Sequence, residues 1–351
     1  MSRVSANVRS WAPFCVAGSI AALVLASCGT AAVAPLPVVS GVPSTSISVP
    51  ITTVGCTTTT CVALGTSTTD VAPMSVGESR GPSGGWKPIE TPAITSTVTI
   101  QDSSCWTDAC LFVGQDASGD IAWRFDASTN AVSHVSTPPG GTAMQAVSCY
   151  ASLSCAAIDD ATGSGPRFET TVDGGDTWTT PVALTQTGDN VLSLACTSSL
   201  DCIFVTASSN GAINIYVTLD GGTTWTPRTP AVAAGWESLT SLTCRKLACV
   251  GLAQEPSGWH VVRTTTLGRT WSVKSALRVA ATTTPTLACS DLTHCAIGGT
   301  KDGSTPWLAT YNAGALTSQR LKYIPSPILQ LACGPKVCAG IGVTTLLTLR
   351  S

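Results

Sequence analysis

The spacing of the cysteines constrains this chain more than any other feature. Fourteen of the 16 cysteines fall into seven close pairs, with four or five residues between the two members of each pair. Successive pairs begin 44 to 49 residues apart. A repeat of this length, in which apolar–polar alternation precedes the pair and a β-rich run follows it, is typical of a four-stranded propeller blade. The pairs are Cys56 with Cys61, Cys105 with Cys110, Cys149 with Cys155, Cys196 with Cys202, Cys244 with Cys249, Cys289 with Cys295, and Cys333 with Cys338.

The pairs predict one disulfide across a hairpin in each repeat. Two antiparallel strands joined by a short turn bring their ends together, so the two thiols can meet. Zinc binding is the alternative interpretation, but CxxC spacing is absent and the three histidines are not placed to complete a shared site. The sequence therefore predicts disulfides, with no metal and no cofactor.

The seven repeats predict an all-β fold, a seven-bladed β-propeller of four-stranded blades spanning residues 37–351. The last repeat, "ILQLACGPKVCAGIGVTTLLTLRS", has room for only three strands. We expect the segment around residues 36–46 to supply the missing strand. Pairing of this N-terminal strand with the last blade would close the ring and protect the edges of an open sheet.

The N-terminus resembles that of a bacterial lipoprotein. Arg3 and Arg9 precede an apolar run over residues 12–27, which ends in "LASC" at Cys28. This ending is similar to a lipobox, which implies that residues 1–27 are a signal peptide and that Cys28 is lipidated. Residues 28–36 would then form a tether, and the protein would be exported and anchored to the outer face of the cell membrane. An ordinary signal peptide with an incidental cysteine is the alternative.

Charge limits the classes of partner. Only 11% of residues are charged and the net charge is −2. The chain therefore has no basic surface for nucleic acid and no basic stripe for anionic lipid headgroups. We expect a monomer that meets the membrane only through its lipid anchor.

Two segments, "TVDGGDTW" (171–178) and "TLDGGTTW" (218–225), resemble the Asp-box or BNR pattern Ser/Thr-x-Asp-x-Gly-x-Thr-Trp. A third, "TTTLGRTW" (264–271), has Thr266 in the aspartate position. The resemblance extends to sialidase-type propellers, photosystem assembly factors and bacterial surface proteins. The residues that match the pattern are Thr171, Asp173, Gly175, Trp178, Thr218, Asp220, Gly222, Trp225, Thr264, Gly268 and Trp271.

We interpret these segments as structural turns between the third and fourth strands of a blade. An aspartate that accepts hydrogen bonds from backbone N–H groups favours turn geometry, and the glycines allow positive φ. A calcium site needs several oxygen ligands, and one aspartate in each turn does not supply them. Function is therefore expected away from Asp173 and Asp220.

Two functions remain open. The first is a non-enzymatic binding or scaffold module at the cell envelope for a protein or glycan partner, with Trp106 and Trp236 as candidate ligand contacts; a role in recruiting a membrane complex is a variant of it. The second is a divergent sialidase-type glycoside hydrolase. The Arg-Ile-Pro motif of sialidases is absent, and acids such as Asp159, Asp160 and Glu169 are interpreted as isolated, with the Asp159–Asp160 pair in a solvated loop. An enzyme should show carboxylates and arginines converging at one mouth of the central channel.

Overall fold

The computed structural model describes residues 38–43, 51–68, 73–80, 85–161, 165–184, 190–230, 233, 235–280, 282–319, 327–342 and 345–350. The chain divides into two units, Met1–Pro35 and Leu36–Ser351. The signal peptide predicted for residues 1–27, the lipidation site Cys28 and the tether 28–36 lie outside the described residues. No helix in the described part of the chain is long and apolar enough to span a membrane.

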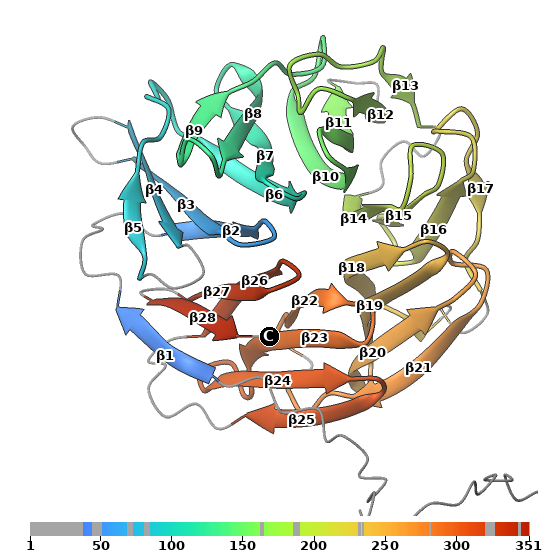
Figure 1. The fold of residues 1–351 in the computed structure, drawn as a ribbon. Coiled ribbons are helices and arrows are strands. Elements are labelled where there is room, and N and C mark those ends of the chain that lie inside the picture. Colours follow the sequence, from blue (N-terminus) through green and yellow to red (C-terminus); the bar gives the residue numbers. More distant parts are fainter. Residues whose placement is uncertain are drawn as a thin grey trace, which may run out of the picture. The chain divides into compact units, whose positions relative to one another are not determined.

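Leu36–Ser351 forms seven antiparallel sheets of four strands each, arranged around a central axis (Figure 1). This confirms the predicted seven-bladed propeller. The first strands contact those of both neighbouring blades in cyclic order, which closes the ring where β2 meets β26. These strands line the axis: β2 (Ile51–Cys56), β6 (Thr99–Cys105), β10 (Ala143–Ala151), β14 (Asn190–Cys196), β18 (Ser238–Arg245), β22 (Thr286–Asp291) and β26 (Ile328–Cys333).

The second strands are buried almost without interruption, because a neighbouring blade covers each of their two faces. The third strands pair with them and carry the chain back to the end at which the cysteine hairpins lie. The second strands are β3 (Cys61–Thr68), β7 (Ala109–Asp116), β11 (Ser154–Ala161), β15 (Cys202–Ala207), β19 (Ala248–Glu255), β23 (His294–Thr300) and β27 (Val337–Gly342). The third strands are β4 (Pro73–Arg80), β8 (Gly119–Asp126), β12 (Gly165–Thr171), β16 (Ile213–Thr218), β20 (Gly258–Thr264), β24 (Pro306–Asn312) and β28 (Thr345–Arg350).

The fourth strands form the outer edge, and the last blade takes its fourth strand from the N-terminal side of the chain. β1 (Val38–Pro43) pairs antiparallel with β28, from Val38 opposite Leu349 to Pro43 opposite Thr345 (Figure 1, blue beside red). This confirms the predicted closure of the ring. The other fourth strands are β5 (Lys87–Ile89), β9 (Ala131–His134), β13 (Val182–Ala183), β17 (Thr226–Pro227), β21 (Trp271–Ala276) and β25 (Ala315–Gln319).

Each predicted disulfide joins cysteines that lie directly opposite each other where the first and second strands of a blade meet. Their Cα atoms are 3.9 to 4.1 Å apart. All seven predicted pairings are confirmed: Cys56 with Cys61, Cys105 with Cys110, Cys149 with Cys155, Cys196 with Cys202, Cys244 with Cys249, Cys289 with Cys295, and Cys333 with Cys338.

The disulfide sulfurs also fill space between blades. The second cysteine of each pair begins or lies in a buried second strand, and Cys249, Cys295 and Cys338 are each at most 1% exposed. A Cβ built on Gly55 of the first blade would lie 2.6 Å from Cys105 Sγ of the second. Only glycine fits at that position.

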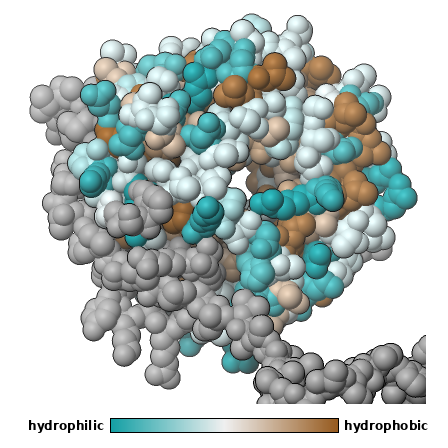
Figure 2. Space-filling model, in the orientation of Figure 1, coloured by the Kyte–Doolittle hydropathy of each residue, from teal (hydrophilic) through white to brown (hydrophobic). Residues whose placement is uncertain are grey.

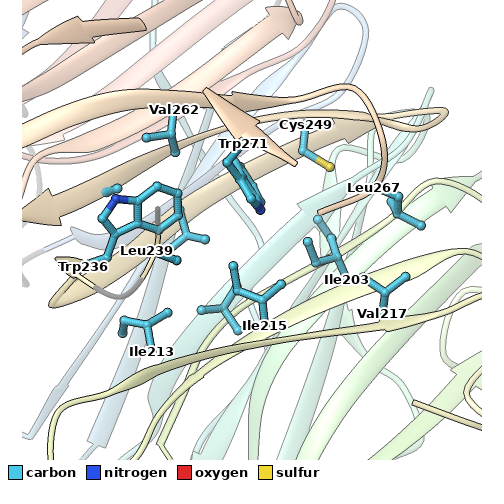
Figure 3. Packing of buried hydrophobic residues seen from close by; sticks show 14 residues of the cluster. Ile203, Ile213, Ile215, Val217, Trp236, Leu239, Cys249, Val262, Leu267 and Trp271 are labelled. Atoms are coloured by element: carbon cyan, nitrogen blue, oxygen red, sulfur yellow. The ribbon is translucent and has the colours of Figure 1, made fainter. Parts of the chain in front are cut away.

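Apolar side chains from facing blades form the core. Between the blades of β14–β17 and β18–β21, the residues labelled in Figure 3 include Ile203 and Ile215 from one side and Val262 and Trp271 from the other. Burial of such side chains is the main stabilising contribution of each blade interface.

Candidate functional site

A channel lies at the centre of the ring in the described structure. It encloses about 880 Å³ and is lined by the seven first strands together with their cysteine hairpins. Most of its wall is neutral, built from backbone, serine, threonine, glutamine and small apolar side chains. Asp102 is the single carboxylate among the lining residues, and Arg245 and Lys246 are the cations.

Asp102 holds two blades together. Its Oδ2 accepts a hydrogen bond from the N–H of Val147 in the next blade at 2.9 Å, and its Oδ1 accepts one from Ser103 N–H at 2.8 Å. The surrounding strands remove water from the carboxyl group, and this raises the pKa of Asp102 to about 6 despite the two backbone donors. A carboxylate engaged in this way acts as a structural tie.

The same tie recurs around the channel with other side chains. Gln330 Oε1 accepts from Val54 N–H at 3.0 Å, and Ser104 Oγ accepts from Cys149 N–H at 2.9 Å. Ser148 Oγ accepts from Cys196 N–H at 2.8 Å. Polar side chains of the channel wall therefore satisfy backbone groups of neighbouring blades, which buried N–H groups require.

The two tryptophans proposed as ligand contacts do not have free ring faces. Trp106 lies in a cysteine hairpin, is only 7% exposed, and packs in the core between the second and third blades. Trp236 is 3% exposed and meets Trp271 edge to face, with ring centroids 5.7 Å apart (Figure 3). Both rings are therefore mostly enclosed by the core, although Trp106 is among the residues that line the channel.

The segments 171–178 and 218–225 form the turns between third and fourth strands, as predicted. Asp173 Oδ1 accepts hydrogen bonds from Thr171 Oγ1 and Thr177 N–H, both at 2.8 Å, and Oδ2 accepts one from Thr177 Oγ1 at 2.6 Å. These donors lower the pKa of Asp173 to about 2. Asp220 makes the equivalent bonds to Thr218 and Thr224.

Glycine and tryptophan complete these turns. Gly222 has φ of 89°, and a Cβ at this position would lie 2.3 Å from Phe168 of the preceding blade. Trp225 packs edge to face against Phe168 and Phe204. Trp178 donates its indole N–H to Ser136 O at 2.9 Å. Each turn therefore clamps one blade onto its neighbour.

A cluster of carboxyl groups lies between the second and third blades, at the end of the ring opposite the cysteine hairpins. Asp159 on β11 is fully buried and is paired with Arg167 on β12, whose Nε lies 2.9 Å from Oδ1. Arg167 also donates to Pro139 O. The prediction that Asp159 lies in a solvated loop is wrong. Asp159 belongs to a buried strand, and its side chain shares a face with the buried Cys155 and Ala157.

Asp120 on β8 and Glu169 on β12 complete this cluster. Glu169 is 1% exposed, and no described residue donates a hydrogen bond to its carboxyl oxygens. Burial and then the charge of Asp159 raise the pKa of Asp120 to about 7, and the same two causes raise that of Glu169 well above its usual range. One arginine faces three acids, so the cluster holds protons at neutral pH. Sequence reasoning missed it because its members come from separate strands.

We next consider whether a substrate can reach the carboxyl groups of this cluster and whether the described residues can hold a metal ion. Its carboxyl oxygens are buried, so a glycosidic bond cannot reach them. Within the described residues, no group of three or more His, Cys, Asp or Glu side chains is arranged to hold a metal ion. Arg167 is the arginine that faces these carboxyl groups, and it is engaged in the ion pair with Asp159.

No family model matches the sequence, and no curated protein matches it. Solved structures do resemble the fold. YCF48 bound to D1 peptide aligns with a TM-score of 0.60 at 14% identity, over 90% of this chain and 97% of that one. Virginiamycin B lyase from Staphylococcus aureus aligns at 0.61 and 10% identity, over 89% and 98%. Trypanosoma rangeli sialidase aligns at 0.44 and 10% identity, over 86% and 54%. At these identities the likeness concerns the fold alone.

Proposed function

We propose that the protein is a cell-envelope lipoprotein whose propeller is a non-enzymatic binding or scaffold module for a protein or glycan partner. The observation that carries this proposal is the chemistry of the channel. Its wall is largely neutral, and its single lining carboxylate is engaged by backbone N–H groups of two blades. A glycoside hydrolase needs two carboxyl groups that face the same cleft. A scaffold has no such requirement.

A protein partner is favoured over a glycan. The structure of YCF48, which shares the fold, was solved with a bound peptide. This observation supports a polypeptide ligand.

The binding proposal is tested by incubating the purified protein on a peptide array and on a glycan array in parallel. We expect saturable binding to a subset of peptides. Binding only to glycans would redirect the proposal to a lectin role. The sialidase alternative is tested on a panel of fluorogenic sialosides, where release of fluorophore by the purified protein would overturn the non-enzymatic proposal.

Lipidation is tested at Cys28. Cells expressing the wild-type protein or Cys28→Ala are fed an alkyne-labelled fatty acid, and the purified protein is assayed for the label. We expect label in the wild type and none in the variant, because only a thiol at this position can carry the lipid. Equal labelling of the two proteins would contradict lipidation at Cys28, and an unlabelled wild type would favour the ordinary signal peptide.

A further inference from the structure

Exposed aliphatic side chains concentrate at one end of three consecutive blades. Eight large hydrophobic side chains are exposed among the described residues, and five of them lie in the cysteine hairpins or third-to-fourth-strand turns of the blades from β10 to β21. We call these five the apolar arc: Leu153, Val172, Leu200, Leu219 and Leu247, exposed by 42%, 72%, 54%, 57% and 52%. In Figure 2, hydrophobic surface gathers mainly on the right-hand side, over the part of the ring occupied by these blades.

Hydrogen bonds hold the members of the arc at the same end of their blades. In each blade the turn donates a backbone N–H to the carbonyl of the hairpin leucine: Gly174 to Leu153 at 2.8 Å, Gly221 to Leu200 at 3.0 Å and Leu267 to Leu247 at 2.7 Å. The hairpins are also fixed by disulfides. The arc is therefore a rigid surface, which lowers the entropic cost of binding.

The fold does not require leucine at these positions. The hairpin leucines stand two residues before the second cysteine, and the other four blades have polar residues there, namely Thr59, Asp108, Thr293 and Lys336. Leu153 also has φ of 58°, a left-handed conformation that is unfavourable for a bulky side chain. An exposed leucine held in a strained conformation stabilises neither the hairpin nor the core, which indicates a role in contact with a partner.

Charge at one end of the arc narrows the choice of partner. Arg245 and Lys246 are exposed beside Leu247, and neither forms an ion pair with a described residue. Acids nearer the other end are already engaged, since Asp173 is held by its threonines and Asp176 pairs with Arg124 at 3.1 Å. Asp201 and Asp220, beside Leu200 and Leu219, also form no ion pair with a described residue, so the middle of the arc carries negative charge and its Leu247 end carries positive charge.

The geometry points to a polypeptide segment of a partner protein as the occupant of the apolar arc. Its aliphatic side chains would lie across blades β10–β21, and a carboxylate would meet Arg245 and Lys246. Membrane insertion fits less well, because Trp and Tyr mark interfacial surfaces and the exposed set contains only leucine and valine. This inference rests on the proposed function and adds the location and the chemistry of the ligand.

The test uses a fluorescein-labelled peptide with alternating leucine and serine that ends in two glutamates. Two companion peptides replace the leucines with serine or the glutamates with lysine. Fluorescence anisotropy with the purified protein should show binding of the first peptide and affinities for both companions weaker by about tenfold or more. Leu200→Thr/Leu219→Thr should weaken binding similarly, and Arg245→Gln/Lys246→Gln should abolish the preference for glutamate over lysine.

Val182→Thr is the matched control, because Val182 is equally apolar and 42% exposed but lies on β13 outside the arc. It should leave peptide affinity unchanged, and circular dichroism should show all variants folded. Equal binding by wild type and the arc variants would overturn the arc as the binding site and leave the proposed binding function intact. If neither this probe nor any arrayed peptide binds, both the arc and the proposed peptide-binding function are overturned. Concentration-dependent dimers, or vesicle binding, lost in the leucine variants would assign the arc to a second copy or to a membrane instead.

Discussion

Thr266 occupies the position of Asp173 and Asp220 in the third of the equivalent turns. It keeps one of the decisive contacts, since its Oγ1 accepts from Thr270 N–H at 2.9 Å, and Thr264 Oγ1 still accepts from Gly268 N–H at 3.1 Å. A hydroxyl has fewer acceptor positions than a carboxylate, so it replaces part of the network. The turn therefore needs an acceptor at this position and does not need a charge, which agrees with a structural role predicted from the sequence.

Substitution of Asp173 tests this role. Asp173→Ala removes the acceptor of three hydrogen bonds and should lower the free energy of unfolding by about 1 kcal/mol. Asp173→Thr copies the third turn and should cost less than half as much. Urea denaturation of the three proteins measures both effects, and equal losses for alanine and threonine would contradict the argument.

The buried cluster predicts how stability depends on pH. The pKa of Asp120 is raised to about 7 and that of Glu169 well above its usual range, so the folded protein binds more protons than the unfolded chain above pH 4 or so. Stability must then fall as pH rises from roughly 4 to 7. The acids with lowered pKa, such as Asp173, titrate below this window.

Urea unfolding at pH 5 and at pH 8 measures this effect. We expect the wild type to be more stable at pH 5, and Glu169→Gln to reduce the difference because an uncharged amide has no proton to lose. Asp160→Asn is a control, since it removes a neighbouring acid outside the buried cluster. A wild-type stability that rises between pH 5 and 8 would contradict the burial of excess acids at this blade interface.

At the scale of the element, the cysteine hairpin is the unit from which each blade is built. Its strands, its disulfide and its position in the blade all follow from local sequence, because the two cysteines face each other at the start of an antiparallel ladder. The position of Asp120 beside the Asp159–Arg167 ion pair does not follow from local sequence. Asp120 comes from the preceding blade, and no short-range pattern specifies which strands face each other across a blade interface.

Removal of one disulfide should lower the stability of the protein without preventing it from folding. Cys105 and Cys110 are separated by 5 positions in the sequence, and closing so short a loop corresponds to about 2 kcal/mol of stabilisation through the unfolded state. Cys105→Ala/Cys110→Ala should therefore lower the free energy of unfolding by about that amount and leave the fold intact. Thiol titration of the denatured, unreduced wild type should detect none of the fourteen paired cysteines, and substantial free thiol would contradict the disulfide framework.

At the scale of the whole molecule, the period of the cysteines predicted the number of blades, and the three-stranded final repeat predicted that β1 would close the ring. The surface that binds a ligand was not predictable in the same way. Trp106 and Trp236 are candidate ligand contacts by sequence because they lie outside the Asp-box segments, yet both are largely buried by neighbouring blades. The hairpin leucines can be found by aligning the seven cysteine pairs, but their exposure and their place at one end of three neighbouring blades are visible only in the structure.

The central claim is that this propeller binds a polypeptide without chemically changing it. Native mass spectrometry of the purified protein, mixed with the leucine–serine peptide that ends in glutamates, tests both parts at once. We expect a one-to-one complex that releases a peptide of unchanged mass, and less of this complex with Leu200→Thr/Leu219→Thr. Recovery of cleaved or modified peptide, or the absence of any complex at concentrations that saturate the arrayed peptides, would contradict it.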